Sequence, residues 1–357
     1  MHTSINMNTR TTPFVRLATA GALALAAAST AQAQSAVTLY GIVDLFVQYG
    51  KGDSTQLAIQ SGGVSGSRLG VKGSEDLGGG LKAQFQLESG ILADTGAQAN
   101  STSFFNRQSW VGLSSESWGA VSAGRQTLPQ YDILDAFDTF GTGVGSSASS
   151  SIVSTTSRAN NSVKYRSPTL GGFTGVALVG LGETTPTATN SGDNANVYSL
   201  GGTYAAGPFS AGVAVNVFKR STNALQDARY ALVTASYDFG VAKLSGAVQK
   251  VRNLAGTEAS DRTEAMVGVN VPVGERNIVS LAMGQVRTSG SDSLNARQWS
   301  LGGTHLLSKR TSLYAVLGHI DNGAATSYTT TTATGAGPVT SAGQDVQSLQ
   351  VGVRHAF

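Results

Sequence analysis

The chain has 357 residues, of which 40% are hydrophobic and 13% charged, with 45 glycines and no cysteine. It contains 24 Lys and Arg and 21 Asp and Glu. Without Arg10 and Arg16 of the N-terminal segment, 22 basic residues face 21 acidic ones. This nearly neutral charge argues against a nucleic-acid-binding protein. The lack of cysteine excludes a disulfide framework and thiolate metal sites.

The first 33 residues have the features of a signal peptide. Arg10 and Arg16 supply positive charge, Leu17 to Ala28 form an apolar core, and Ala31-Gln32-Ala33 is a small-x-small cleavage site. The apolar core is shorter than the roughly 20 residues that a membrane-spanning helix needs. We therefore expect a signal peptide over residues 1–33 and a mature domain over residues 34–357.

The mature chain begins with segments in which apolar and polar side chains alternate. From Val37 to Tyr49 most apolar side chains share one face, with Thr38, Asp44 and Gln48 on the other, and the run from Leu81 to Glu88 alternates strictly. A period of two residues indicates β-strands. No apolar run in the mature chain is long enough for a membrane helix, so this chain could span a bilayer only as a closed barrel.

The connections between these segments alternate in length. Short turns such as 74–80 and 114–119 alternate with longer polar links such as 51–67 and 90–103, as in barrels whose short turns face the periplasm and whose long loops face outward. The fold class predicted is all-β, a transmembrane antiparallel β-barrel of about 16 strands with an aqueous lumen. The strands are expected near 37–50, 68–74, 81–89, 104–113, 119–126, 158–166, 172–182, 197–205, 208–219, 228–239, 241–251, 263–272, 276–287, 297–307, 311–320 and 346–357.

One long insertion, from Thr127 to Arg158, interrupts this succession. An irregular segment of about thirty residues inside a compact domain is uncommon and usually functional. It carries three closely spaced carboxylates, Asp132, Asp135 and Asp138, and continues into Ser and Gly. Arginines punctuate the strands on either side, at positions 68, 107, 125 and 158. An acidic loop opposite basic strand positions is what a water-filled, charge-selective pore requires.

The last strand also carries a signal. Leu349, Val351, Val353, His355 and Phe357 share one face, so the chain ends on an outward-facing aromatic residue. Because an unpaired strand edge in hydrocarbon is costly, we expect this strand to pair with the first one. Other aromatic residues at strand ends fit the girdles of a membrane barrel; they are Tyr40, Tyr49, Tyr237 and Phe239.

Together these motifs resemble those of the general diffusion porins of the Gram-negative outer membrane, in the branch whose mature chains open with QSxVTLYG. The resemblance covers the whole mature chain. It is carried by Gln34 to Gly41 (QSAVTLYG), Ser67 to Gly78 (SRLGVKGSEDLG), Asn106 to Leu113 (NRQSWVGL), Gly124 to Gln126 (GRQ), Arg158 to Tyr165 (RANNSVKY) and the terminal Phe357.

The resemblance implies a sixteen-stranded barrel whose third outer loop, about 127–158, folds into the lumen as a constriction. It implies a homotrimer embedded in outer-membrane lipid and lipopolysaccharide, with Phe357 as the signal read by the barrel-assembly machinery. The Ser-rich half of the loop departs from the family pattern and leaves its path open. The residues that resemble the family's pore-lining cations are Arg68, Arg107 and Arg158. Lys72 shares the strand face of Arg68 and Lys164 that of Arg158, so both extend this ladder, and Arg125 is a further candidate. The acidic residues of the loop are Asp132, Asp135 and Asp138.

The function expected is passive diffusion of small hydrophilic solutes and ions, without turnover, cofactor or metal. Basic residues outnumber the loop carboxylates, which predicts a mild preference for anions. A substrate-specific channel and a barrel hydrolase are the alternatives, the latter requiring a histidine near a carboxylate or serine at the barrel rim. The three aspartates could instead cap a helix, lie on the surface or ligate calcium.

Overall fold

The computed structural model describes residues 36–183, 185, 187, 194–222, 224–331 and 335–357, so the expected signal peptide lies outside the described residues. The helices are α2 (Pro129–Phe137) and the single turns η1 (Glu258–Ser260) and η2 (Asp292–Leu294). None of the described helices is long and apolar enough to cross a membrane. The strands are β1 (Ala36–Lys51), β2 (Thr55–Ser61), β3 (Arg68–Gly78), β4 (Leu81–Leu92), β5 (Ala97–Gln98), β6 (Gln108–Ser115), β7 (Gly119–Thr127), β8 (Arg158–Arg166), β9 (Phe173–Gly180), β10 (Val197–Ala206), β11 (Phe209–Phe218), β12 (Ala228–Asp238), β13 (Lys243–Arg252), β14 (Arg262–Val273), β15 (Asn277–Thr288), β16 (Ala296–Leu306), β17 (Thr311–Asn322) and β18 (Val346–Ala356).

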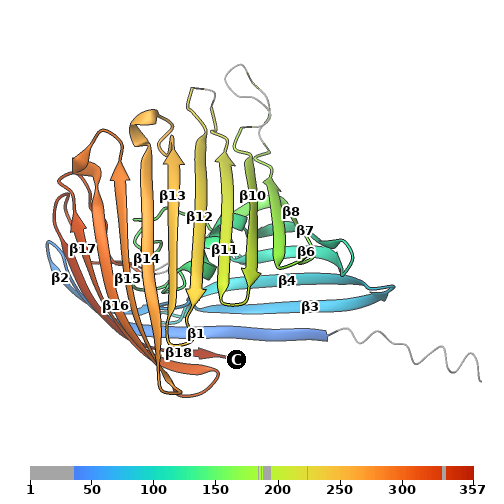
Figure 1. Cartoon of the computed structure of the whole chain (residues 1–357), viewed down its shortest axis with the longest axis horizontal. Helices are drawn as coiled ribbons and strands as arrows, with labels where there is room; N and C mark the ends of the chain where they lie inside the picture. The colour runs from blue at the N-terminus through green and yellow to red at the C-terminus, as the bar shows by residue number, and fades with distance from the viewer. Residues whose placement is uncertain (1–35, 184, 186, 188–193, 223, 332–334) are drawn as a thin grey trace, which may run out of the picture.

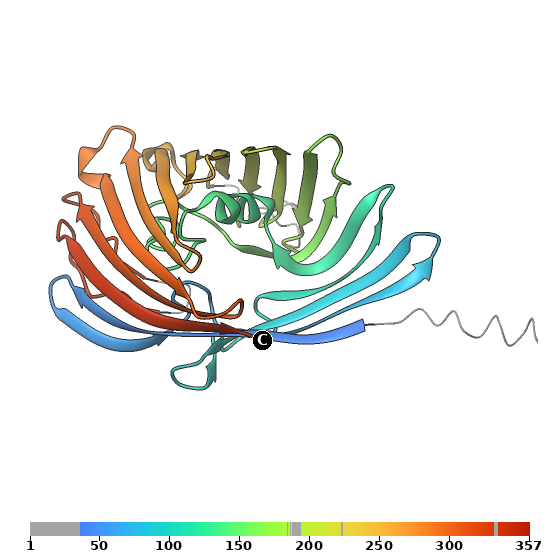
Figure 2. The same ribbon diagram turned by 60° about the horizontal axis from the view of Figure 1, so that its bottom comes forward.

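The strands form a sheet that closes on itself (Figures 1 and 2). β1 closes the ring, because its Ala36–Ile42 half pairs with β3 and its Ile42–Lys51 half pairs with β18. All of these pairings are antiparallel, and β2 and β5 lie within connections, so sixteen strands make up the wall. The predicted closed barrel of about 16 strands is confirmed.

Two of the expected links contain strands of their own. β2 lies inside the link 51–67 and pairs with Leu45–Lys51 of β1, and the two-residue β5 lies inside the link 90–103 and pairs with the end of β4. The expected strand near 104–113 begins only at Gln108. β2 escaped the sequence reading because its short run is flanked by glycine and serine, although Leu57 and Ile59 continue the exposed apolar face of β1.

The wall has its apolar side chains outside and its polar side chains inside. On β10 and β11, for example, Leu200 and Val213 are 59% and 53% exposed, whereas Gln249 of β13 and Glu264 of β14 are fully buried. The expected faces of the first strand are confirmed, with Asp44 buried inside. This arrangement is the reverse of a soluble sheet and is that of a barrel whose outer surface contacts lipid.

The end of the chain completes the ring. The backbone N–H of Gly41 donates to the Phe357 carbonyl and the N–H of Phe357 donates to the Gly41 carbonyl, each at 3.1 Å. The Phe357 ring lies over Gly41 so closely that a Cβ there would come within 3.0 Å of ring atoms and of the Arg68 carbonyl. The predicted pairing of the last strand with the first is therefore confirmed, and a glycine is needed at the closing contact.

We predict that Gly41→Val destabilises the folded barrel, because the new side chain forces the Phe357 ring or the β1–β3 pairing to move. The expected loss in free energy of unfolding is about 1–3 kcal/mol, measured by urea titration in detergent micelles with tryptophan fluorescence. Gly303→Val on β16 is the matched control, since a Cβ at Gly303 meets no atom within 4 Å. Equal unfolding midpoints for the two variants would contradict the role of the Gly41–Phe357 contact.

Candidate functional site

The connection between β7 and β8, residues 128–157 and called here the inner loop, lies inside the barrel. Figure 2 shows its helix α2 within the ring of strands, and α2 contacts β9 to β13. Pro129 opens the helix, where its fixed φ suits the first turn. Ile133, Leu134 and Phe137 then share a buried apolar cluster with Ala214, Leu232, Ala247 and Met266 of the wall. The inner loop is thus fixed to one side of the lumen by apolar contacts.

Glycines of the wall make this close approach possible. A Cβ on any of five wall glycines would come within 3.0 Å of an inner-loop side chain. These glycines are Gly201 and Gly212, which face Ile133, Gly268, which faces Thr139, Gly284, which faces Ser147, and Gly302, which faces Phe140. Larger residues at these positions would displace the loop toward the open side of the lumen.

The Ser-rich half of the inner loop is held by hydrogen bonds. Ser154 donates to the fully buried Glu264 carboxylate from its backbone N–H at 2.8 Å and from its hydroxyl at 2.6 Å. Glu264 also accepts hydrogen bonds from Gln249 at 2.8 Å and Arg262 at 2.6 Å. The hydroxyl of Ser150 bonds to Gln298, whose amide donates to the Gly145 carbonyl at 3.0 Å. These bonds define the path of the loop segment that departs from the family pattern.

Basic side chains gather across the lumen from this loop, around one carboxylate. Glu88 on β4 accepts from Arg107 Nε at 2.7 Å, lies 4.0 Å from Arg68 Nη1, and accepts from the Tyr40 hydroxyl at 2.8 Å. Lys72 lies over the ring of Tyr40, with Nζ 5.3 Å from the ring centroid, a cation–π arrangement. One acid therefore organises two arginines, a tyrosine and, through the tyrosine, a lysine.

Two more predicted cations link this group to the inner loop. Arg158 donates from Nε to the Arg107 carbonyl at 2.6 Å, and its guanidinium lies 6.0 Å from the ring centroid of Tyr131 on α2. Lys164 forms an ion pair with Asp132 of α2 at 2.6 Å and donates to the Thr127 carbonyl at 2.9 Å. Both contacts join β8 to the start of the loop.

Arg125 lies beside this group without contacting Glu88. It occupies the point where the register between β7 and β8 shifts, and its guanidinium is bound to the Asn106 carbonyl, at 2.7 Å, and to the Asn160 side chain. Arg68, Lys72, Arg107, Arg125, Arg158 and Lys164 together are called the basic wall below.

The three loop aspartates differ in their surroundings. Asp132 is paired with Lys164 of the basic wall, whereas Asp135 accepts from the Thr142 hydroxyl at 2.7 Å, within the loop. Asp138 accepts from the Phe140 N–H at 2.9 Å and from the Ser146 hydroxyl, and burial raises the pKa of its carboxyl above the usual range. Carboxylate oxygens of these three aspartates do not all lie within 4.8 Å of one another, so they do not converge as the ligands of one cation. That Asp135 and Asp138 form the acidic side of the constriction remains a prediction.

Sequence reasoning missed Glu88 and Arg354 and misplaced Tyr40. Glu88 was recognised only as the end of an alternating run, and Arg354, whose Cα lies opposite that of Asp44, was not singled out. The assignment of Tyr40 to an outer aromatic girdle is wrong, because its hydroxyl bonds to Glu88 in the lumen. Tyr40 is separated from Asp44 and Gln48 by an even number of residues, so the alternation of the strand places all three on the inner face and could have predicted this position.

Comparison with known proteins gives consistent results. The family model described as Gram-negative porin matches residues 18–325. The outer membrane porin protein 32 of Delftia acidovorans is 38% identical over 93% of this chain and 97% of its own length. An outer membrane porin protein of Bordetella pertussis is 32% identical over 95% of this chain and 98% of its own length.

Solved structures extend this similarity to the fold. The anion-selective porin from Comamonas acidovorans superposes with a TM-score of 0.80 at 34% identity, covering 91% of this chain and all of that one. The OmpT protein of Vibrio cholerae in its trimer form superposes with a TM-score of 0.68 over 90% of this chain and 99% of that one, at 19% identity, so this likeness concerns the fold alone.

We predict that Glu264→Ala loosens the Ser-rich half of the inner loop, because the Ser154 N–H loses its buried acceptor. Hydrogen exchange at the Ser154 amide should accelerate about tenfold or more, in line with about 1–3 kcal/mol for an unsatisfied buried group. Peptide-resolved exchange mass spectrometry measures this rate. Glu275→Ala in an exposed short turn is the control, and unchanged exchange in Glu264→Ala would show that the apolar contacts alone hold the loop.

Proposed function

Because the chain belongs to the Gram-negative porin family, we propose that it is a general diffusion channel of the outer membrane with a mild preference for anions. Small hydrophilic solutes and ions pass through the lumen without turnover, and the inner loop limits their size. Selection by charge arises between the inner loop and the basic wall, where charged groups lie in a narrow aqueous passage.

The observation that carries the anion preference is the imbalance of charge around Glu88. Six cations make up the basic wall, and two carboxylates, Glu88 and Asp132, form ion pairs with them. Asp135 and Asp138 are hydrogen-bonded within the loop and form no ion pair with the wall, and even with them counted the six cations face four carboxylates. The excess positive charge favours entry of anions, the selectivity that the name of the Comamonas acidovorans relative states for that protein.

The basic side chains also have a geometry suited to transport. Arg107 and Arg158 are tethered through Nε, at 2.7 Å to Glu88 and 2.6 Å to the Arg107 carbonyl. A guanidinium carries five N–H donors, so each retains others for a passing anion. Guanidinium N–H groups that are fixed in position but have no protein acceptor allow an anion to bind briefly and leave, as conduction requires.

The two alternative functions have weaker support. A substrate-specific channel would bind one solute saturably. A barrel hydrolase would use a histidine beside a carboxylate, and His319 does lie 2.6 Å from Asp321 near the long-loop end of β17. The relatives that this chain matches are named as porins, which are channels, and we propose that this chain likewise has no catalytic activity. Hydrolysis of ester or peptide substrates by the folded barrel would contradict this.

We further propose that the protein assembles as a homotrimer, inserted by the barrel-assembly machinery through its C-terminal strand and Phe357, and surrounded by lipid and lipopolysaccharide. The trimer form described for the Vibrio cholerae barrel supports the fold's capacity for this state.

We predict that replacing Arg68, Arg107 and Arg158 by Gln together lowers the ratio of chloride to potassium permeability by at least about twofold, because the excess positive charge at the constriction is removed. Glu88→Gln should raise the same ratio by removing the central acid. Reversal potentials under a salt gradient in planar bilayers measure both changes.

Arg276→Gln, in the exposed short turn between β14 and β15, is the matched control and should leave the ratio unchanged. A wild-type channel that prefers cations, or a Glu88→Gln variant that shifts toward cations, would refute the proposed charge mechanism.

For the assembly, we predict three equal conductance steps when a single inserted particle closes under voltage, and a trimer mass in mild detergent. Single-channel recording and light scattering measure these properties. A monomeric mass together with single-step closure would refute the trimer while leaving the channel proposal intact.

A further inference from the structure

Three side chains with metal-binding groups meet at the long-loop end of the barrel wall. His319 and Asp321 lie on β17, and Asp345 directly precedes β18. One atom of each, an imidazole nitrogen or a carboxylate oxygen, lies within 4.8 Å of the other two. Among the described residues, no other three His, Asp or Glu side chains converge in this way.

The three groups lie on the outer face of the wall, apart from the lumen. Ile320 of β17 points inward and is fully buried, so His319 and Asp321 on either side of it point outward. The β17–β18 ladder ends with the pair Ile320 and Val346, so Asp321 and Asp345 follow as cross-strand neighbours. Like charges directly opposite each other on a sheet are destabilising, and a positive partner between them would remove this cost.

Neighbouring groups hold the imidazole and one carboxylate in place. The ring of Trp299 on β16 lies 5.6 Å from that of His319, whose side chain is only 16% exposed. The Nε2 atom of this imidazole is 2.6 Å from Oδ1 of Asp321. The backbone N–H of Asn322 donates to Oδ1 of Asp345 at 3.2 Å. Contacts of this kind orient the ligands of metal sites before the ion binds.

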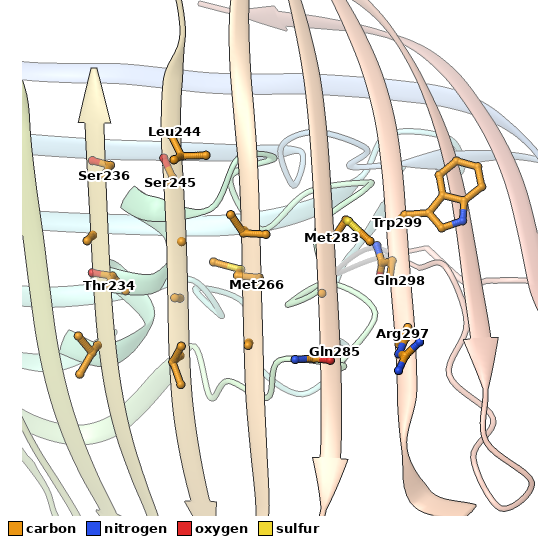
Figure 3. Close-up of a pocket in the computed structure, with 18 of the residues that line it drawn as sticks. Thr234, Ser236, Leu244, Ser245, Met266, Met283, Gln285, Arg297, Gln298 and Trp299 are labelled. Atoms are coloured by element: carbon orange, nitrogen blue, oxygen red, sulfur yellow. The ribbon is translucent and has the colours of Figure 1, made fainter. Parts of the chain in front are cut away.

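The cluster is accessible from outside the barrel. The Asp321 side chain is 57% exposed. Together with Arg297 and Trp299, which Figure 3 shows on β16, it borders a hollow of about 990 Å³. Long loops face outward in such barrels, so an ion from the external medium can reach the carboxylates.

Two basic residues lie near the aspartates but do not pair with them. Arg297 is in register with Asp321 on the neighbouring strand, and Lys51 lies at the end of β1, which pairs with β18. Among the described residues, neither cation forms an ion pair with Asp321 or Asp345. The positive partner that the two carboxylates require is therefore not supplied by these side chains.

We propose that His319, Asp321 and Asp345 bind a divalent transition-metal ion of the zinc class. Nε2 of the imidazole and one oxygen of each carboxylate are the ligands, and water completes the coordination. Imidazole suits zinc, copper and nickel, whereas Ca²⁺ and Mg²⁺ prefer oxygen ligands alone. On binding, bonds from the metal to His319 and Asp321 replace the hydrogen bond between them, and its proton is released to solvent.

The ion requires only a small adjustment of the site. Ligands of a tetrahedral zinc ion lie about 3.5 Å apart, so atoms now up to 4.8 Å apart must approach by about 1 Å. Asp321 lies just before the last long connection and Asp345 at its end, so the ion joins both ends of this connection. The sequence predicted no metal, because Asp345 is distant from the other two ligands along the chain.

Trp299 provides a direct test, since the chain has three tryptophans and the other two, Trp110 and Trp118, can be changed to Phe. The folded barrel, without a histidine tag, is titrated in detergent with Cu²⁺, which quenches an indole at short range. We expect saturable quenching that an excess of Zn²⁺ reverses and the same excess of Mg²⁺ does not. Isothermal titration calorimetry with Zn²⁺ should give one ion per chain.

His319→Gln should weaken Zn²⁺ binding by at least about tenfold, because even the loss of an outer-shell partner costs a metal site about 10–100-fold. Asp321→Asn combined with Asp345→Asn should have at least the same effect. His305→Gln is the matched control and should bind Zn²⁺ like the wild type, since this exposed histidine has the amide oxygen of Asn277 as its partner, at 2.8 Å.

Two further measurements separate a ligand role from a structural one. Arg297→Gln removes a positive charge beside Asp321 and should tighten Zn²⁺ binding by about twofold or more. Zn²⁺ should raise the urea midpoint of the wild type and leave that of His319→Gln unchanged, because an ion that binds only the folded state stabilises it.

Three results would overturn the proposal. One is a wild-type chain that binds no Zn²⁺, another is a folded His319→Gln variant that binds it as tightly as the wild type, and the third is reversal of Cu²⁺ quenching by Mg²⁺. The site goes beyond the proposed channel function and is independent of it, because its ligands lie outside the lumen. Conductance is recorded for every variant and should not change, so failure of the metal site is distinguished from failure of the channel.

Discussion

The structure depends on the requirement that backbone N–H and C=O groups in hydrocarbon be hydrogen-bonded within the protein. A sheet meets this requirement only when it has no free edge, and here β1 removes both edges by pairing with β3 along one half and with β18 along the other. The closing bonds are those between Gly41 and Phe357, made possible by a glycine under an aromatic ring. A single glycine thus permits the terminal contact of a 357-residue chain.

Closure in lipid also determines where a packed core can form. The apolar faces of the strands point outward, so the interior of the barrel is largely polar, and one apolar cluster around Tyr230 and Val251 is formed by the wall itself. The inner loop supplies the other clusters, because its apolar residues lie against wall strands around much of the barrel. Wall glycines and buried polar residues such as Glu264 then fix its position, so that one side of the lumen is filled and the other stays open.

The open side carries the charge. Glu88 reduces the repulsion among closely spaced arginines, and without it Arg68 and Arg107 would face each other with no acid between them. Hydrogen bonds through Nε hold the guanidinium groups of Arg107 and Arg158 in place.

The sequence alone determined the properties that depend on near neighbours. Period-two alternation and the alternation of short and long connections predicted a closed barrel of about sixteen strands. The apolar face of the terminal strand predicted that this strand pairs with the first one. The charged residues of the lumen were harder to predict from the sequence. Arg68, Arg107 and Arg158 were identified through their motifs, yet Glu88 was not singled out, Tyr40 was assigned to the wrong face, and β2 was read as a loop. Whether an aspartate of the inner loop contacts Lys164, as Asp132 does, or turns back on its own loop, as Asp138 does, was decided only by the tertiary structure. The physical reason is that strand faces follow from local periodicity, whereas a side chain's partner depends on which distant strands the closed barrel brings across from it.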